Sequence, residues 1–326
     1  MIVDLHVGDS TAIMTTLDAD SVDAVVTDPP YGLRLLQRTW DAIVPGVDAW
    51  AQALRVAKPG AHLAAFGGTR TMHRLMIAIE DAGWEIRDQI AWHYASGFPK
   101  GQASLKPAME LIVLARKPLR GTVAENVQQY GTGALNIDAC RVGDDERYNH
   151  RSNGQRGQGI GMNLVSNPAY SGRFVRGYWP ANMLHDGSDE VISGMSDASK
   201  YFYCAKASRA DRDDGCAGLP LRRTSSIEAR NRESNLGQFD GPTPMGRNYH
   251  PTVKPTALMT YLCRLVTPPG GVVLDPFCGS GSTGRGALIA GASRFVGIDQ
   301  DSEYIEIARR RIEAARLPLD AHWSAE

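Results

Sequence analysis

The chain has 326 residues, of which 43% are hydrophobic and 22% are charged. This composition is that of a globular protein and excludes disordered, collagenous and fibrous chains, and the length allows two ordinary domains or one large α/β domain with an insertion. The 35 Lys and Arg nearly balance the 36 Asp and Glu, so a surface for nucleic acid has to be a local patch.

Residues 1–118 alternate short apolar runs with helical patterns. Helices are expected at 47–56 and 71–81, where apolar residues recur at helical spacing, and we interpret Pro59-Gly60 and Gly83 as the stops that close them. β-branched and apolar runs predict strands at 22–27, 61–66, 90–94 and 111–115. This strand–helix rhythm predicts a mostly parallel sheet.

Residues 119–249 lose this rhythm. They contain few continuous apolar runs and are rich in Gly, Asn, Gln, Ser and Arg. We interpret this region as a loop-rich insertion, parts of which order only on a partner.

Residues 250–316 return to the α/β pattern, and the tail after Leu317 is expected to fray. We expect helices at 256–266 and 302–315, strands at 272–274 and 295–298, and a glycine-rich turn after the first of these strands. Because this part has too few strands for a sheet of its own, the two ends of the chain have to share one sheet. The insertion is then an excursion from that sheet.

The glycine-rich turn, residues 279–284, matches the pattern G-x-G-x-x-G. It follows a predicted strand, opens a predicted helix and is trailed by Asp299 at the end of the next strand, which is the arrangement of a nucleotide-type cofactor site. A phosphate-binding loop is disfavoured because Arg285, and not Lys, follows the last glycine.

Asp275 stands directly before this turn, at the tip of a strand. A carboxylate there repels a pyrophosphate but suits a cationic ligand group. S-adenosylmethionine carries an ammonium, a sulfonium and a ribose, and no phosphate. The charge of Asp275 therefore favours S-adenosylmethionine over NAD, which stays open.

The predicted strand 22–27 runs straight into Asp28-Pro29-Pro30-Tyr31. Two prolines end the strand and stiffen the turn, so that the Asp28 carboxylate and the Pro29 carbonyl are fixed acceptors. Two such acceptors suit the exocyclic amine of adenine or cytosine, because they bind its hydrogens and aim its lone pair at a methyl carbon. Tyr31 would stack on the base, which has to be flipped out of duplex DNA.

These elements together resemble the beta class of DNA amino-methyltransferases, whose catalytic motif comes first, whose cofactor motif comes last and whose recognition region lies between them. Further elements that resemble this family are Gly8-Asp9-Ser10, His250-Pro251-Thr252-Val253-Lys254-Pro255, and Gly297-Ile298-Asp299 with the helix that follows. The resemblance covers residues 1–118 and 245–316. It implies a sequence-permuted, Rossmann-like, doubly wound α/β methyltransferase fold with a recognition insertion.

The resemblance also assigns residues. Its catalytic residues are Asp28, Pro29, Pro30 and Tyr31, and Asp at the first of these positions favours adenine N6 over cytosine N4. Its residues for the cofactor, S-adenosylmethionine, are Asp9 near the adenine, Lys254 near the carboxylate end, and Asp275, Phe277, Gly279, Ser280, Gly281, Thr283 and Asp299. Cys278 has no assigned role.

The resemblance implies that residues 1–118 form the catalytic part of the methyltransferase domain, 119–249 the target-recognition insertion and 250–326 the cofactor-binding part. Duplex DNA is the implied partner, while a homodimer and a cognate restriction enzyme of a restriction-modification system stay open. The arginines of the insertion are candidates for phosphate and base contacts: Arg141, Arg147, Arg151, Arg156, Arg173, Arg176, Arg222, Arg223, Arg230, Arg232 and Arg247.

Cysteine spacing and hydropathy bear on the compartment. The five cysteines include no Cys-x-x-Cys pair, and His185, Cys140, Cys204 and Cys216 fit no zinc pattern, so we expect neither disulfides nor a metal. The N-terminus has no features of a secretion signal, and no stretch of about 18 apolar residues is present. We therefore expect a cytoplasmic protein without a membrane partner.

Three alternative functions stay open. They are N4-cytosine methylation, methylation of RNA or of a protein glutamine, and NAD-dependent oxidoreduction with the glycine turn as the dinucleotide site. A non-catalytic DNA-binding protein is disfavoured because both half-sites of the reaction are present. Carbon-5 cytosine methylation is excluded because it requires a Cys nucleophile, normally in a Pro-Cys pair, and the sequence has no such pair.

Overall fold

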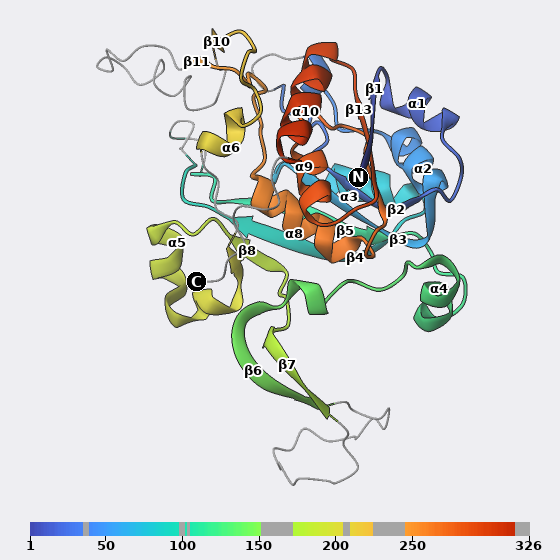
Figure 1. Cartoon of the computed structure of the whole chain (residues 1–326), viewed down its shortest axis with the longest axis vertical. Helices are drawn as coiled ribbons and strands as arrows, with labels where there is room; N and C mark the ends of the chain where they lie inside the picture. Colours follow the sequence, from blue (N-terminus) through green and yellow to red (C-terminus); the bar gives the residue numbers. More distant parts are fainter. Residues whose placement is uncertain are drawn as a thin grey trace.

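The computed structural model describes residues 1–34, 39–97, 102, 105–150, 172–204, 209–223 and 245–316 (Figure 1). Within these ranges the centre is a nine-stranded sheet of order β1-β13-β12-β2-β3-β5-β4-β8-β9. The strands are β1 (Ile2–Val7), β2 (Val22–Thr27), β3 (Ala57–Gly67), β4 (Glu85–His93), β5 (Met109–Arg116), β8 (Met183–His185), β9 (Tyr203–Cys204), β12 (Val272–Asp275) and β13 (Arg294–Asp299).

The α-helices of the described residues are α1 (Ser10–Thr16), α2 (Val47–Val56), α3 (Met72–Asp81), α4 (Val123–Tyr130), α5 (Asp189–Met195), α6 (Arg209–Asp213), α8 (Thr256–Val266), α9 (Ser282–Ile289) and α10 (Ser302–Ala314). Helices cover both faces of the sheet, whereas α5 and α6 lie to one side of it (Figure 1). No helix in the described ranges is both long and apolar enough to cross a bilayer.

The two ends of the chain share the sheet, as the sequence predicts. β1 pairs in parallel with β13, and β12 lies between β13 and β2. In the β12–β2 pair, Val273 is opposite Ala24 and Leu274 is opposite Val25. The carboxyl ends of β2 and β12, which lead into Asp28 and the glycine turn, are therefore adjacent.

The core has two layers because the residues of the parallel strands face alternately to opposite sides. Ala24 and Val26 of β2 pack with Leu262 and other residues of α8, whereas Val25 packs with Trp50 of α2, and all five are fully buried. Strands buried on both faces read as near-continuous apolar runs, which is why the sequence shows them clearly.

Strand β5 is antiparallel to both of its neighbours, β3 and β4, and the strand–helix rhythm does not predict this direction. No helix separates β4 from β5 in the described part of their connection. As a result, the first residues of β5 lie beside the carboxyl ends of β3 and β4, with Leu111 opposite Gly67 and Glu110 opposite Trp92.

The interpretation of Pro59-Gly60 as a helix stop is wrong. Helix α2 ends at Val56, and β3 begins at once and contains Pro59 and Gly60 at an irregularity of its pairing with β2. The Pro59 carbonyl, freed by this irregularity, accepts a hydrogen bond from Nδ2 of the buried Asn126 at 2.9 Å. The other predicted helices and strands are confirmed, most of them with ends shifted by one to five residues.

The described part of 119–249 is more regular than the sequence predicts. β8 pairs with β4 and β9 with β8, so this region extends the main sheet. β6 (Val142–His150) and β7 (Gly172–Tyr178) form a hairpin that projects from the sheet (Figure 1), and β10 (Arg222–Arg223) pairs with β11 (Met245–Gly246). Two predictions fall on residues or side chains that the structure does not describe. One is the tail after Leu317, and the other concerns seven of the candidate arginines: Arg147, Arg151, Arg156, Arg173, Arg223, Arg230 and Arg232.

The contact between α8 and α9 generates a prediction for Gly286. A Cβ atom on Gly286 would lie 2.6 Å from the Met259 carbonyl carbon and 2.7 Å from the Thr260 nitrogen, so α8 has to move. We expect Gly286→Ala to lower the free energy of unfolding by about 1–3 kcal/mol in urea titrations. Gly194→Ala in α5 is the matched control, because no atom lies within 4 Å of its Cβ position, and we expect it to stabilise by about 0.5–1 kcal/mol. Equal effects of the two substitutions would contradict the close packing.

Candidate active site

A cavity of about 1480 Å³ lies at the carboxyl ends of the parallel strands. It is lined by the segments after β2, β12 and β13 and by the segment before α8: residues 28–31, 275–280, 299–302 and 250–254. Open α/β sheets place ligands at this edge, and the volume exceeds what one drug-sized ligand needs. The predicted catalytic turn and the predicted glycine turn therefore share one cavity.

The turn after β2 is held by hydrogen bonds to its backbone. Oδ1 of Asp41, a residue only 2% exposed, accepts from the backbone nitrogens of Tyr31 at 2.7 Å and Gly32 at 3.0 Å. The Thr71 hydroxyl donates to the Tyr31 carbonyl at 2.7 Å. These bonds and the two prolines fix the direction of the Asp28 carboxylate.

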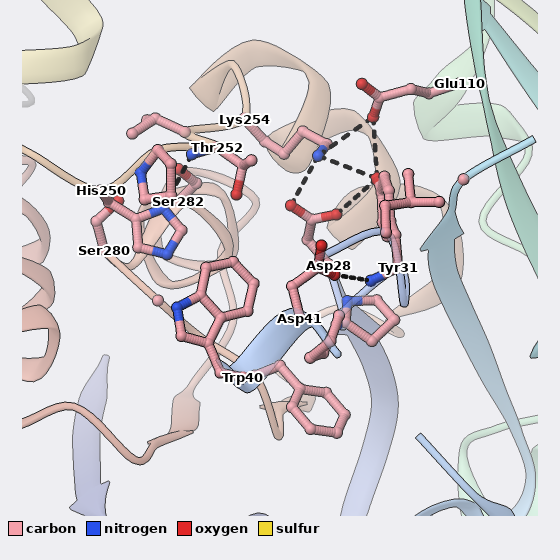
Figure 2. A pocket seen from close by; sticks show the side chains of 18 of the residues that line it. Asp28, Tyr31, Trp40, Asp41, Glu110, His250, Thr252, Lys254, Ser280 and Ser282 are labelled. Atoms are coloured by element: carbon pink, nitrogen blue, oxygen red, sulfur yellow. Dashed lines mark hydrogen bonds and ion pairs between the residues drawn. The ribbon is translucent and has the colours of Figure 1, made fainter. Parts of the chain in front are cut away.

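Asp28 belongs to a cluster of two carboxylates, one ammonium and one phenol (Figure 2). Lys254 Nζ lies 2.7 Å from Asp28 Oδ2, 3.2 Å from Glu110 Oε2 and 3.2 Å from the Tyr31 hydroxyl oxygen. The Tyr31 hydroxyl is within 2.9 Å of Asp28 Oδ1 and 3.0 Å of Glu110 Oε2, and it donates its one hydrogen to one of them at a time.

Burial and mutual charge shift the pKa of each member of this cluster. Burial raises the pKa of Asp28. The Lys254 ammonium offsets part of this rise, and the Glu110 carboxylate adds to it. Burial disfavours the Lys254 ammonium, but the carboxylates of Asp28 and Glu110 outweigh it, so the pKa of Lys254 lies above its ordinary value. Burial and the two carboxylates raise the pKa of Tyr31. Lys254 therefore stays charged and Tyr31 stays neutral at neutral pH.

Helix α10 packs against the glycine turn and donates hydrogen bonds to it. Arg311 is fully buried, and its guanidinium donates to the Ser280 carbonyl at 2.7 Å and to the Ser282 hydroxyl at 3.2 Å. Gly281 has a φ of +78°, and a Cβ on it would lie 2.8 Å from Ala308 Cα. The turn can approach α10 this closely only with glycine at that position.

Two acidic side chains flank the glycine turn. The Asp275 carboxylate accepts from the Thr27 hydroxyl at 2.6 Å and from the Phe277 nitrogen at 3.0 Å, and burial raises its pKa to about 7. Asp299 accepts from the Gly279 nitrogen at 2.9 Å, and burial raises its pKa as well. The Thr27–Asp275 bond joins β2 to β12 directly beneath the cavity.

Most of the predicted site residues line the cavity: Asp28, Pro29, Pro30, Tyr31, Lys254, Asp275, Phe277, Gly279, Ser280, Thr283 and Asp299. Asp9 is not among the lining residues, because its carboxylate caps α1 by accepting from the Ala12 nitrogen at 2.9 Å, although Gly8 and Ser10 line the cavity. Gly281 is not among them either, because it faces α10. Lys254 contacts Asp28 and Tyr31 of the predicted catalytic turn, and its assignment to the cofactor stays a prediction.

Several residues of the site were missed from the sequence. Glu110 precedes a predicted strand, but only the antiparallel direction of β5 brings it to the cavity. Trp40 has no sequence signal; its ring lies 6.4 Å from that of His250 at an interplanar angle of 18°, and His250 packs edge-on against Tyr304 at 4.5 Å. Asp41 carries no motif, and its role follows only from its hydrogen bonds to the turn.

Some candidate arginines of the insertion have partners within the protein. Arg222 pairs with Glu303 at 2.8 Å, Arg141 pairs with Asp138 at 2.9 Å, and Arg247 donates to the Leu219 carbonyl. Contact of these arginines with DNA stays a prediction. Among the described residues, no group of three or more His, Cys, Asp or Glu could hold a metal ion.

Comparison with known proteins identifies a family and individual relatives. The model of a DNA methylase family matches residues 22–310. The DNA adenine methyltransferase YhdJ of Escherichia coli (strain K12) is 44% identical over 77 residues, which are 24% of each chain. The type II methyltransferase M2.DpnII of Streptococcus pneumoniae is 49% identical over 65 residues, 20% of this chain and 24% of that protein. The chain thus matches about a quarter of the length of these curated relatives.

The fold has counterparts among solved structures. The PvuII DNA methyltransferase, described as cytosine-N4-specific, superimposes with a TM-score of 0.54 at 14% identity, over 98% of this chain and 88% of that one. At this identity the likeness concerns the fold alone. The prediction of a Rossmann-like methyltransferase fold is confirmed.

The buried cluster predicts how stability depends on pH in Lys254→Met. Without the ammonium, the two carboxylates face each other, and we expect a loss of about 3–5 kcal/mol at neutral pH. The pKa of Asp28 in the folded variant should then lie further above its value in the unfolded chain. Because ionising Asp28 costs more in the folded variant than in the unfolded chain, the loss in the free energy of unfolding should grow as pH rises from 5 to 8. Urea titrations at both pH values measure it.

Lys117→Met is the control for this substitution. Lys117 forms a more exposed pair with Asp20 at 2.7 Å, and the control should lose about 1 kcal/mol or less, with little change between the two pH values. A loss in Lys254→Met that does not depend on pH would contradict the assigned coupling.

Proposed function

The chain belongs to the DNA methylase family, and on this premise we propose that it transfers the methyl group of S-adenosylmethionine to the N6 amine of adenine in duplex DNA. S-adenosylmethionine is the methyl donor of the family. The observation that carries the proposal is the single cavity, which is lined both by Asp28 and by the glycine turn on the neighbouring strand.

The Asp28 turn fits an exocyclic amine. The nitrogen of such an amine is a poor nucleophile because its lone pair is delocalised into the ring. The Asp28 carboxylate and the Pro29 carbonyl, both at the cavity, would accept its two hydrogens and free the lone pair. Asp41 and Thr71 hold this turn before any ligand arrives, so the acceptors need little reorganisation.

The glycine turn and its two acids fit the cofactor. Burial raises the pKa of Asp275, so a sulfonium or an ammonium beside it would favour the ionised carboxylate. Asp299, at the end of the next strand, would accept from the ribose hydroxyls. A Cβ on Gly279 would lie 2.7 Å from the His250 ring. The wall of the cavity at this position is therefore formed by backbone atoms, without a side chain. The bound cofactor supplies a methyl group on a good leaving group. The Asp275 carboxylate disfavours a dinucleotide pyrophosphate, and with it the NAD-dependent alternative.

Two arguments support adenine over cytosine. Asp at the first catalytic position favours adenine N6 by the resemblance to the beta class of DNA amino-methyltransferases, and the Escherichia coli relative is described as a DNA adenine methyltransferase. The PvuII enzyme bears on the fold and not on the base. Duplex DNA is the proposed partner, which the cavity would engage through a flipped base.

The test is the product. The purified chain is incubated with methyl-labelled S-adenosylmethionine and unmethylated genomic DNA, and the nucleosides are identified by mass spectrometry. We expect labelled N6-methyl-2′-deoxyadenosine. N4-methylcytosine would contradict the choice of base, and label in RNA or protein with none in DNA would contradict the choice of substrate.

Asp28→Ala should lower the rate at least about a hundredfold while the Kd for S-adenosylmethionine changes by less than about threefold.

The support of the glycine turn by α10 gives a binding prediction. Arg311→Met removes the donors to the Ser280 carbonyl and the Ser282 hydroxyl, so we expect S-adenosylmethionine to bind at least about tenfold more weakly in calorimetric titrations. Arg310→Met on the same helix is the control, because Arg310 is partly exposed and pairs with Glu306, and it should bind normally. Equal affinities of the two variants would contradict the role of Arg311.

A further inference from the structure

Glu110 is a carboxylate in the cavity that neither half of the proposed reaction uses. It is the second residue of β5 and reaches the cavity because β5 runs antiparallel to its neighbours. It contacts both Lys254 and Tyr31 but, unlike Asp28, does not lie on the turn that would grip the amine (Figure 2). Its role in the cluster is therefore explained neither by the binding of the amine nor by the binding of the cofactor.

Methylation of an amine releases a proton. The nitrogen lone pair forms the N–CH₃ bond, the C–S bond breaks with its electron pair going to sulfur, and the nitrogen, now positively charged, has to lose a hydrogen. The nearest base is the Asp28 carboxylate that already accepts this hydrogen. Asp28 then holds a proton that has to leave before the next turnover.

Among the described residues, the hydrogen-bond partners of Asp28 offer one onward path for this proton. The Lys254 ammonium cannot accept a proton. The Tyr31 hydroxyl can, because its oxygen lies 2.9 Å from Asp28 Oδ1 while its hydrogen can be directed to Glu110 Oε2 at 3.0 Å. In this arrangement Asp28 donates to Tyr31 as Tyr31 donates to Glu110, so one proton leaves Asp28, one reaches Glu110, and the phenol is unchanged.

We propose that Glu110 receives the proton released by methyl transfer, through the Tyr31 hydroxyl, and passes it to water. This inference rests on the proposed function, since it takes Asp28 as the first proton acceptor. Glu110 acts through Tyr31 and does not touch the reacting atoms. Lys254 holds both carboxylates at fixed distances from that hydroxyl and keeps the pair from carrying two uncompensated charges.

The surroundings of Glu110 suit an outlet. Its side chain is 25% exposed against 17% for Asp28, and the cavity wall just before it includes Leu105 and Met109, which are 92% and 39% exposed. Among the residues that the structure describes, the titratable groups facing it are Lys254, Asp28 and Tyr31, together with Tyr94, whose pKa burial and Glu110 raise to about 12. Lys106, on the segment before β5, also lines the cavity. His93 lines the cavity on the neighbouring strand β4.

Kinetics of Glu110→Gln test the relay. The variant keeps the shape of the side chain and removes its basicity, and we expect kcat on DNA to fall at least about tenfold while the Kd for S-adenosylmethionine changes by less than about threefold. Glu85→Gln is the matched control, because Glu85 pairs with Arg116 on strands β4 and β5 and does not line the cavity, and its kcat should be unchanged. A kcat of Glu110→Gln within twofold of wild type overturns the proposal.

Tyr31→Phe tests the same path from its middle, since it keeps the ring and removes the hydroxyl. If Tyr31 and Glu110 serve one path, the double variant should be no slower than the slower single variant. Effects that multiply overturn the relay. Incorporation of label by the wild type tests the proposed function separately, so a failure of that function is distinguishable from a failure of the relay.

Chemical rescue separates a proton acceptor from a space-filling residue. In Glu110→Ala, added formate or acetate should restore kcat at least about fivefold, whereas formamide and acetamide, which have the same shapes and are not basic at this pH, should not. Rescue by the amides as well, or by neither pair, overturns the proposal.

A further readout needs neither cofactor nor DNA. Carbon-13 spectra of the side-chain carboxyls, with the Asp28 signal assigned through Asp28→Asn, should show Asp28 titrating at lower pH in Glu110→Gln than in wild type. The direction follows because the Glu110 anion raises the pKa of Asp28. An unchanged Asp28 titration would mean that the Glu110 carboxylate does not act on Asp28, and it overturns the proposal.

Discussion

The parallel pairing of β2 with β12 is the contact on which the site depends. Asp28 and Asp275 are far apart in the sequence, and the pairing of Ala24 with Val273 and of Val25 with Leu274 brings the ends of their strands side by side. The Thr27–Asp275 hydrogen bond at 2.6 Å closes the pair at the edge of the cavity. A register shift of one residue would turn each of these side chains to the other face of the sheet and separate the two halves of the site.

The second constraint is charge. Asp28 and Glu110 can both be ionised in a partly buried cavity because Lys254 lies between them. The segment that carries Lys254 is itself fixed by residues of 119–249: Asp211 of α6 accepts from the Thr256 nitrogen at 2.7 Å, and the Arg212 guanidinium donates to the His250 carbonyl. The described part of the insertion thus contributes to the geometry of the cavity as well as to the proposed recognition of DNA.

Sequence patterns locate the helices and the buried strands because periodicity and burial are local. Helix α2 (47–56) and helix α8 (256–266) begin and end where their apolar spacing predicts. Strand direction is not local, so the antiparallel β5 and with it the position of Glu110 could not be predicted. The short motifs predict most of the cavity wall. The capping of α1 by Asp9 was not predicted, and the assignment of Asp9 to the cofactor stays a prediction.

In the proposed function, the cavity binds the methyl donor on the glycine turn with its reactive end toward Asp28. A crystal structure of the chain with S-adenosylhomocysteine would show this arrangement through the distance from the sulfur of the ligand to the nearest Asp28 carboxylate oxygen. We expect a gap with room for a methyl group and one amine, roughly 6–8 Å, open to the cavity. A sulfur that points away from Asp28, or a ligand bound elsewhere on the chain, would contradict it.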